Sequence, residues 1–383
     1  MRFSTVFLSF LSVALAARPF LNEPDTGIEE VFGSLPAGTL PELSLIAGLP
    51  DFEWAAKRVL HPFSYMHFRN GASGEYSYRN NLEIFHRYRF RPRVMQDVTN
   101  VASTLPITLL GHNFSAPIFI SPCARAGLAH PESELGLVRG AAAENILYMP
   151  SLFANLSIED ISAAKGEGQV LFQQINKASI DNDTQALFQR IESSGAKAIV
   201  FTVDAVSPRN RQRSGRFGFD QGDYSSYDLA TWDTYKQLQT MTSLPIVLKG
   251  IMSVEDARAA VAAGVPAIIL SNHGGRQLDG APSPLEVALE IHEKSPEVFT
   301  QIEVYADGGV RYGTDVLRLL ALGVRAVGLG RPFMYANVYG TEGVTYAIQM
   351  LKREIAVDAG NLGLPDLKAI NASYVNWTPD LRL

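Results

Sequence analysis

The stretch AIILSNHGGRQLDGAPSPLEVALEIHEK, residues 267–294, holds a strand, a loop and a helix in sequence order. Its first four residues are apolar, as expected for a strand that is buried on both faces. After Pro-Ser-Pro, apolar side chains return at helical spacing. The loop between them, SNHGGRQLDG, places an imidazole, two glycines and an arginine where the strand ends.

The same unit recurs along the chain from Ala116 onward, eight times at a spacing of roughly 30 residues. The predicted strands are PIFIS, ILYM, VLFQ, AIVFTV, PIVLK, AIILS, IEVYA and AVGLG. The predicted helices are ESELGLVRGAAAE, SIEDISAAK, NDTQALFQRIESS, DLATWDTYKQLQ, VEDARAAVAA, PLEVALEIHEK, GTDVLRLLA and EGVTYAIQMLKREIAVDA. Eight buried parallel strands with right-handed crossovers predict an α/β fold, the (β/α)8 or TIM barrel.

A doubly wound open sheet is the alternative, but no Gly-X-Gly-X-X-Gly fingerprint follows the first strand. We therefore expect one barrel, with a core at about residues 116–358. Residues 19 to about 50 are rich in Pro, Gly and Leu and predict an extended arm, followed by a short helix at DFEWAAKRVL, residues 51–60.

Composition narrows the classes of function. Hydrophobic residues make up 46% of the 383 and charged residues 19%, which predicts a folded chain with a large core. The net charge is -6 and no basic cluster stands out, so nucleic acid and anionic membranes are poor candidate partners. Cys123 is the sole cysteine, which excludes an internal disulfide and a cysteine-based zinc site. We predict no metal.

The N-terminus predicts a secretory signal peptide over residues 1–17. Met1-Arg2 precedes FSTVFLSFLSVALA, an apolar run too short for a comfortable membrane span. A core helix is the less favoured interpretation. Five Asn-X-Ser/Thr sequons favour an N-glycosylated protein of the secretory pathway, at Asn113, Asn155, Asn182, Asn371 and Asn376. Residues 18–383 then form one domain.

Polar residues follow the predicted strands and converge on one mouth of the barrel. The seventh strand runs into Asp307-Gly308-Gly309-Val310-Arg311, and the eighth into Gly330-Arg331. Glycines let backbone N–H groups approach an oxyanion, and arginines supply positive charge. Ordinary turn chemistry would explain either motif alone. Their pairing after these two strands predicts a ligand that bears a phosphate.

Five motifs together resemble one enzyme family: SNHGGRQLD, LPIVLKG, TVD, ADGGVRYGTDVLRLLALG and LGRP. The sequence is similar, from about Leu40 to about Asp358, to the FMN-dependent α-hydroxy-acid oxidases and dehydrogenases, which include glycolate oxidase, lactate oxidase and flavocytochrome b2. No haem-binding segment precedes the motifs, which resembles the oxidase-type members. The resemblance implies oxidation of a 2-hydroxy acid to the 2-oxo acid, with O2 as acceptor and H2O2 as product, by a homotetramer.

The catalytic assignment combines chemistry with this resemblance. Oxidation of a carbinol needs a base, and the imidazole of His273 titrates near working pH. The resemblance implies that Asp204 orients His273. It also implies that Arg276 and Arg211 bind the substrate carboxylate, although RNRQR offers Arg213 as a competitor for Arg211.

The resemblance also assigns the residues around the flavin. Lys249 would face the pyrimidine end of the ring, with Gln173 and Thr202 bonded to its polar edge. The remaining contacts would come from the first and second strands, from the ends of the sixth and seventh, and from the phosphate loops: Pro122, Cys123, Ala124, Ser151, Ser271, Asp307, Gly308, Gly309, Val310, Arg311, Gly330 and Arg331.

Two departures from the family pattern concern substrate recognition. His67 stands where the family has a tyrosine, with Tyr65 two residues away, and we count it among the substrate-binding residues. Ile175 replaces a second tyrosine, and the segment between Thr202 and Lys249 is short. We expect a bulkier or less polar substrate than glycolate or lactate. Two alternatives stay open: an FMN enzyme of the same fold that acts on a bulkier intermediate of specialised metabolism, and a non-catalytic flavin-binding barrel.

Overall fold

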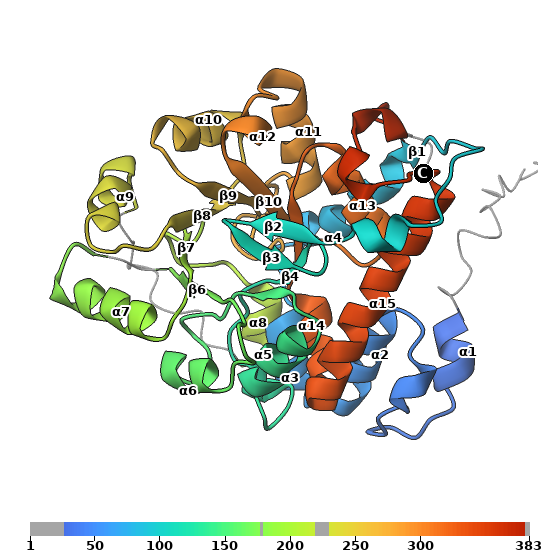
Figure 1. Cartoon of the computed structure of the whole chain (residues 1–383). Helices are drawn as coiled ribbons and strands as arrows, with labels where there is room; N and C mark the ends of the chain where they lie inside the picture. Colours follow the sequence, from blue (N-terminus) through green and yellow to red (C-terminus); the bar gives the residue numbers. More distant parts are fainter. Residues whose placement is uncertain (1–26, 177–178, 219–229, 380–383) are drawn as a thin grey trace, which may run out of the picture.

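The computed structural model describes residues 27–176, 179–218 and 230–379 (Figure 1). Eight parallel strands form its centre, in the spatial order β5-β4-β11-β10-β9-β8-β7-β6. A parallel bridge between Tyr148 and Leu171 joins the two outermost strands and closes the barrel. The strands are β4 (Ile118–Ile120), β5 (Leu147–Tyr148), β6 (Phe172–Ile175), β7 (Ala198–Thr202), β8 (Ile246–Ile251), β9 (Ala267–Leu270), β10 (Glu303–Asp307) and β11 (Ala326–Leu329).

Helices surround the strands, and one helix overlaps or lies within each range predicted as helical (Figure 1). These helices are α5 (Glu134–Ala143), α6 (Ile158–Ala163), α7 (Asn182–Ser193), α9 (Trp232–Gln239), α10 (Val254–Ala262), α11 (Pro284–Lys294), α13 (Gly313–Ala321) and α15 (Gly340–Asn361). Three further short helices lie between them: α8 (Gln212–Arg216), α12 (Val298–Gln301) and α14 (Arg331–Ala336). The predicted (β/α)8 barrel is confirmed.

Alternation along the strands sorts the side chains into two apolar layers. One set fills the barrel interior, as Phe172 in β6, Val200 in β7 and Ile269 in β9 do. The alternate set packs outward against the helices, as Ile175 and Leu270 do. Moving two residues from an interior side chain toward the carboxyl end of a strand therefore reaches the mouth. This places the polar residues Gln174, Thr202, Lys249, Ser271 and Asp307 there.

Segments that precede the barrel in the sequence cover its amino end and line the mouth at its carboxyl end. The hairpin of β2 (Ile107–Leu109) and β3 (His112–Phe114) contributes Leu109 and Phe114 to the interior apolar cluster. Its Leu110 N–H donates to Glu303 at the start of β10, so the hairpin covers the amino ends of the strands.

The predicted arm contains little regular structure within its described part: α1 (Ile28–Phe32) and a 3-10 turn at Leu43–Leu45. The helix expected at residues 51–60 is α2 (Leu49–Val59), which packs on α14. It is followed by α3 (Pro62–Arg69) and α4 (Tyr76–Glu83). A short antiparallel pair, β1 (Arg89–Phe90) and β12 (Val375–Asn376), fixes the end of the chain against this region.

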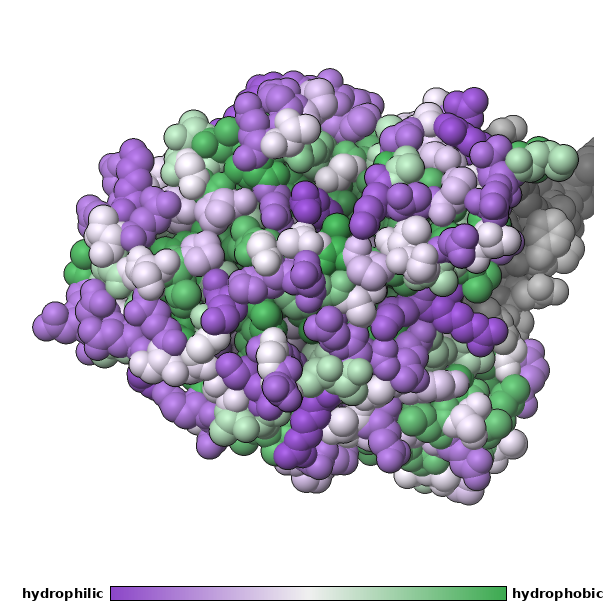
Figure 2. Space-filling view, viewed as in Figure 1, coloured by the Kyte–Doolittle hydropathy of each residue, from purple (hydrophilic) through white to green (hydrophobic). Residues whose placement is uncertain are grey.

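The surface in Figure 2 intersperses hydrophilic and hydrophobic residues. All five sequon asparagines are exposed, from Asn113 in β3 to Asn376 in β12. Among the described residues, no helix combines the length and apolar character that a membrane crossing requires. The predicted signal peptide lies outside the described residues.

Candidate active site at the mouth of the barrel

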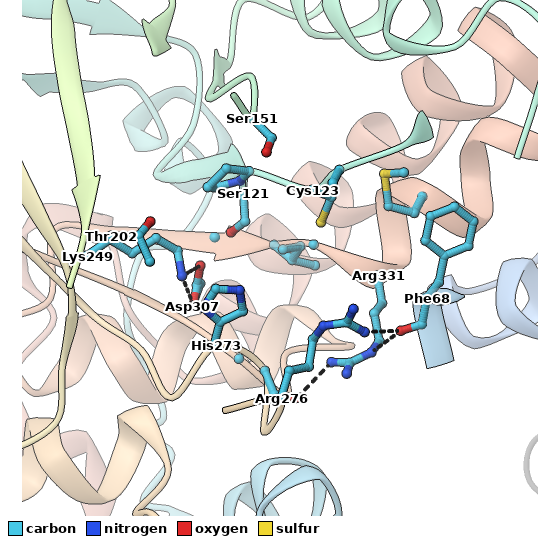
Figure 3. Close-up of a pocket in the computed structure, with 18 of the residues that line it drawn as sticks. Phe68, Ser121, Cys123, Ser151, Thr202, Lys249, His273, Arg276, Asp307 and Arg331 are labelled. Atoms are coloured by element: carbon cyan, nitrogen blue, oxygen red, sulfur yellow. Dashed lines mark hydrogen bonds and ion pairs between the residues drawn. The ribbon is translucent and has the colours of Figure 1, made fainter. Parts of the chain in front are cut away.

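A cavity opens at the carboxyl ends of the strands, and most predicted site residues line it (Figure 3). The predicted residues on its wall are His67, Pro122, Cys123, Ala124, Ser151, Thr202, Arg211, Lys249, His273, Arg276, Asp307, Gly308, Gly309, Val310, Arg311, Gly330 and Arg331. Asp204 and Ser271 lie directly behind this wall and bond to residues on it. The wall also contains residues that the sequence did not single out, among them Phe68, Ser121, Phe153, Gln174, Asn176 and Arg209.

A buried polar network joins the ends of β8, β9 and β10. The Nζ of Lys249 donates to the Ser271 hydroxyl at 2.7 Å and lies 3.2 Å from the Asp307 carboxylate. The Ser271 hydroxyl in turn donates to Asp307 at 2.6 Å. Lys249 is only 4% exposed, so this carboxylate compensates a charge that burial would otherwise make very costly. The network fixes the ammonium group at the wall of the cavity, and Figure 3 shows its Lys249–Asp307 part.

His273 and Asp204 form the second polar pair. The His273 Nδ1 lies 2.9 Å from Asp204 Oδ1, and the Asp204 side chain is fully buried. Asp204 can approach this closely because residue 250, which faces it, is a glycine. A Cβ at Gly250 would lie 2.7 Å from the Asp204 Cβ, and its φ of +113° is also unfavourable for other residues.

The electrostatics of this pair suit a general base. Burial lowers the pKa of His273 below its ordinary value and outweighs Asp204, which raises it. Burial alone would raise the pKa of Asp204, but His273, Lys249 and Arg209 hold it below its usual range. At neutral pH a neutral imidazole therefore faces a carboxylate. Since the carboxylate accepts the Nδ1 proton, Nε2 is left without one and can accept the proton of a substrate.

The loop after β9 is anchored against α4. Asn272 and Asn81 exchange two amide hydrogen bonds of 2.8 Å, and the Asn272 Oδ1 also accepts from the Gly275 N–H. A Cβ at Gly275 would lie 2.5 Å from the Tyr78 backbone nitrogen. The second glycine of SNHGGRQLDG is thus required by the close approach of two backbones.

Two arginines cap the carboxyl end of α3. The Arg276 Nη1 donates to the carbonyls of His67, Phe68 and Asn70, and Arg331 donates to Phe68, Gly274 and Asn70. Helix-end carbonyls lack partners within the helix and carry partial negative charge, so both contacts are favourable. The structure records no partner among the described residues for Nε and Nη2 of Arg276. Burial and the charge of Arg331 lower the pKa of Arg276 to about 9, so it remains a cation at neutral pH.

The structure distinguishes Arg211 from Arg213, the alternative ligand for the substrate carboxylate. Arg211 lines the cavity, with its Nε bonded to the Arg276 carbonyl and Nη2 to Gln277. Arg213 is held by a two-pronged pair with Glu75, both bonds 2.7 Å, and does not line the cavity. Arg209, at the start of RNRQR, does line it, and the sequence gave no reason to choose it.

His67 lines the cavity as predicted, whereas Tyr65 points elsewhere. The Tyr65 hydroxyl donates to Glu53, and its ring stacks on Tyr335. Burial, followed by the charges of Arg276 and two other arginines, lowers the pKa of His67 to about 3. His67 is therefore neutral at physiological pH.

One predicted register on β6 is wrong by one residue. Gln173 does not line the cavity; its amide donates to the carbonyls of Pro150 and Gln174. Gln174 is at the mouth instead, and it donates to Thr202. Likewise Ile175 packs in the outer layer, and Asn176 occupies the wall. Alternation decides this, because Phe172 points into the barrel and Gln174 shares its face. Ile175 therefore does not line the cavity, and it gives no support to the expectation of a less polar substrate.

The loop after β10 meets the N-terminal helices. Gly309 has a φ of +82°, and a Cβ there would collide with the Asn81 carbonyl. The next N–H groups, of Arg311 and Tyr312, donate to Asp315 in the first turn of α13. The Arg311 guanidinium is held at 3.7 Å from Glu53 of α2.

This set of groups fits the expected FMN. The loop backbone at residues 308–310 lines the cavity beside two arginines, as a phosphate requires. Lys249, paired with Asp307 just before this loop, supplies a buried cation. The Ser121 hydroxyl is buried and finds no partner among the described residues, so a ligand in the cavity would satisfy it.

Comparison with known proteins agrees. The family model described as FMN-dependent dehydrogenase matches residues 56–229 and 220–377. The L-lactate dehydrogenase (cytochrome) of Wickerhamomyces anomalus is 35% identical over 88% of this chain, and the chain spans 62% of that relative's length. A peroxisomal (S)-2-hydroxyacid oxidase of Arabidopsis thaliana is 34% identical over 86% of this chain and 96% of its own.

Among solved structures, the recombinant flavin-binding domain of baker's yeast flavocytochrome b2 superposes with a TM-score of 0.83. It is 35% identical, and the match covers 92% of this chain and 91% of that one. The chain belongs to the FMN-dependent dehydrogenase family.

Proposed function

We propose that this protein oxidises 2-hydroxy acids to 2-oxo acids with bound FMN. The observation that carries the proposal is the His273–Asp204 pair in a cavity that also presents Arg276, Arg211 and Lys249. The candidate base, the candidate ligands of the substrate carboxylate and a buried cation thus face the same cavity. A barrel that only bound a flavin would need no buried histidine–carboxylate pair.

The residues divide the work as follows. Arg276 and Arg211 hold the substrate carboxylate, with Nε and Nη2 of Arg276 offering a planar fork. His273 Nε2 accepts the hydroxyl proton. Bound FMN would supply the acceptor for the hydrogen and two electrons that leave the carbon bearing the hydroxyl. Asp204 holds the imidazole in the reactive tautomer and stabilises it once it is protonated.

Molecular oxygen is the proposed electron acceptor, with H2O2 as product. Ala124 lines the cavity and adds little bulk beside the proposed flavin. This small side chain leaves space beside the flavin for O2, which supports this choice. An oxygen electrode that records no uptake while substrate is being oxidised would refute it.

A visible spectrum of the purified protein tests the function. We expect a yellow protein with one FMN per chain, released by acid as FMN and not as FAD. Addition of 2-hydroxy acids without oxygen should bleach the flavin. Folded protein that neither carries nor takes up FMN, or a flavin that no 2-hydroxy acid reduces, would refute the proposal.

We also propose that the protein is secreted, N-glycosylated and a homotetramer. The exposure of all five sequon asparagines and the signal-like N-terminus support the first two statements. Glycosidase treatment should lower the apparent mass, and the mature protein should begin near residue 18. A chain that stays cytosolic and keeps Met1 would refute secretion, and light scattering of a monomer would refute the tetramer.

A further inference from the structure

A side lobe extends from the cavity between the loop after β5, the turn after β4 and the segment after β7. His67, Ala124, Phe153, Arg209 and Arg211 line both spaces, so the lobe is continuous with the proposed substrate site. It has a volume of about 550 Å³, many times the roughly 30 Å³ that one water molecule occupies in the liquid. A substrate held near His273 therefore has room to extend here.

The lobe is positively charged. Arg125, Arg209 and Arg211 line it, and no aspartate or glutamate is among its described lining residues. His67, the remaining titratable group on its wall, is neutral at physiological pH, with its pKa lowered to about 3 by burial and by neighbouring arginines. The lobe thus offers positive charge without a lining carboxylate.

Among the three arginines of the lobe, Arg209 gives the main argument for a bound anion. Burial lowers its pKa, which means that the protein desolvates the cation. The described structure gives its guanidinium no hydrogen bond, and the one described carboxylate that acts on it, Asp204, is already bonded to His273. A partly buried cation without a dedicated partner gains stability when an anion arrives. Arg211 differs, because it already bonds to the loop after β9.

We propose that the side lobe binds a second, distal anionic group, so that the preferred substrate is a 2-hydroxy acid with two negative charges. This inference rests on the proposed function. The first carboxylate lies at Arg276 and Arg211, beside His273. The second lies against Arg209, with Arg125 at the exposed rim. A carboxylate or a phosphate has the required chemistry.

The test compares substrates that differ by one charge. We would measure kcat/KM for the (S)-enantiomers of 2-hydroxybutanoate against 2-hydroxybutanedioate, and of 2-hydroxypentanoate against 2-hydroxypentanedioate. A 2-hydroxypropanoate with a 3-phosphate separates the two anions. We expect the doubly charged acid of at least one pair to lead by about tenfold or more. Raising the salt concentration should reduce the part of the lead that comes from Arg125 at the exposed rim, because screening weakens exposed charges most.

Variants assign the effect to the lobe. Arg209→Gln should lower kcat/KM for the doubly charged acid about tenfold more than for its singly charged partner, mainly through KM. Any effect of the loss of Arg209 on Asp204 falls on both members of a pair and cancels in this ratio. Arg125→Gln should remove less of the lead, since it lies at the rim. Arg216→Gln is the matched control, because Arg216 is exposed on α8 and lines neither space. If Arg209→Gln does not fold, Arg209→Lys, which keeps the charge, should keep part of the lead.

Two kinetic results would overturn the inference: wild-type protein that does not prefer the doubly charged acids, or an Arg209→Gln loss that is equal for both members of a pair. Failure of the proposed function is distinguishable, since then neither member of any pair would bleach the flavin. Binding of 2-oxobutanoate and 2-oxobutanedioate, followed by flavin absorbance, reports on the lobe without any turnover. A doubly charged ligand that does not bind more tightly there would also overturn the inference.

Discussion

The two walls of the cavity differ in how completely their polar groups are satisfied. On the wall formed by β8, β9 and β10, Lys249, Ser271 and Asp307 bond to one another across three strands. On the wall formed by the end of β6 and the segment after β7, the Asn176 Oδ1 is buried without a partner among the described residues, and Arg209 lacks a hydrogen bond. The first wall is organised before any ligand arrives, whereas the second has polar groups that a ligand would satisfy.

This difference suggests a division of labour. Chemistry that depends on fixed distances belongs on the organised wall, because preorganised groups need no rearrangement during the reaction. Recognition of the variable part of a substrate belongs on the other wall. Changes to the organised wall should therefore reduce the rate for every substrate, and changes to the second wall should alter the choice among substrates.

The largest expected effect is that of His273→Ala. Loss of the general base should slow flavin reduction by about 10²- to 10⁴-fold. FMN should still bind, since the residues predicted to bind its phosphate are 308–311 and 330–331, not His273. Stopped-flow absorbance measures the rate, and the unreduced spectrum is the control. Reduction of the variant at the wild-type rate would show that the base is another group.

Arg276→Lys should have the next largest effect. Lysine keeps the charge but loses the planar fork and some of the contacts to the carbonyls at the end of α3. We expect about a 10- to 100-fold loss in kcat/KM for carboxylate substrates, and a smaller loss for neutral carbinols of matched size. Equal losses for both substrate classes would mean that the arginine serves mainly to hold α3 in place.

Two variants test the register of β6, and the larger expected effect is a change of about tenfold in FMN affinity. Gln174→Leu removes a donor from the wall and its bond to Thr202, so FMN affinity should fall by about that factor. Gln173→Leu removes bonds behind the wall, so it should lower the melting temperature and leave FMN affinity nearly unchanged. Apo-protein titration with FMN and thermal unfolding distinguish them. The opposite result would restore the register expected from the sequence.

Local pattern predicted the barrel and the strand ends that reach its mouth, whereas the resemblance assigned the roles of Lys249, Ser271 and Asp307 on the organised wall. Buried strands show as apolar runs, and the residues two positions beyond an interior side chain necessarily reach the mouth. On β6 that pattern is ambiguous, because Phe172, Gln173, Gln174 and Ile175 alternate in neither hydrophobicity nor size. The face was decided by resemblance, and it was wrong by one residue.

Arg209 was missed for a different reason. RNRQR places three arginines at alternate positions, and nothing local tells which of them meets a carboxylate elsewhere in the chain. The partner of Arg213 is Glu75, 138 residues away in sequence. Only the tertiary structure shows that this contact removes Arg213 from the site and leaves Arg209 and Arg211 on its wall.

The smallest expected effect concerns pH, and it tests the His273–Asp204 pair most sharply. Burial lowers the pKa of His273 below its ordinary 6.5, so the imidazole is already neutral above that pH. The kcat/KM for a substrate whose carboxylate stays ionised should therefore change less than about twofold between pH 7 and 8, and fall about tenfold per unit once the pH drops below the His273 pKa. Asp204 raises that pKa, so Asp204→Asn should move the acid limb to still lower pH while it reduces the plateau rate. A limb that moves to higher pH, or a wild-type limb above 6.5, would contradict the assignment of this limb to His273.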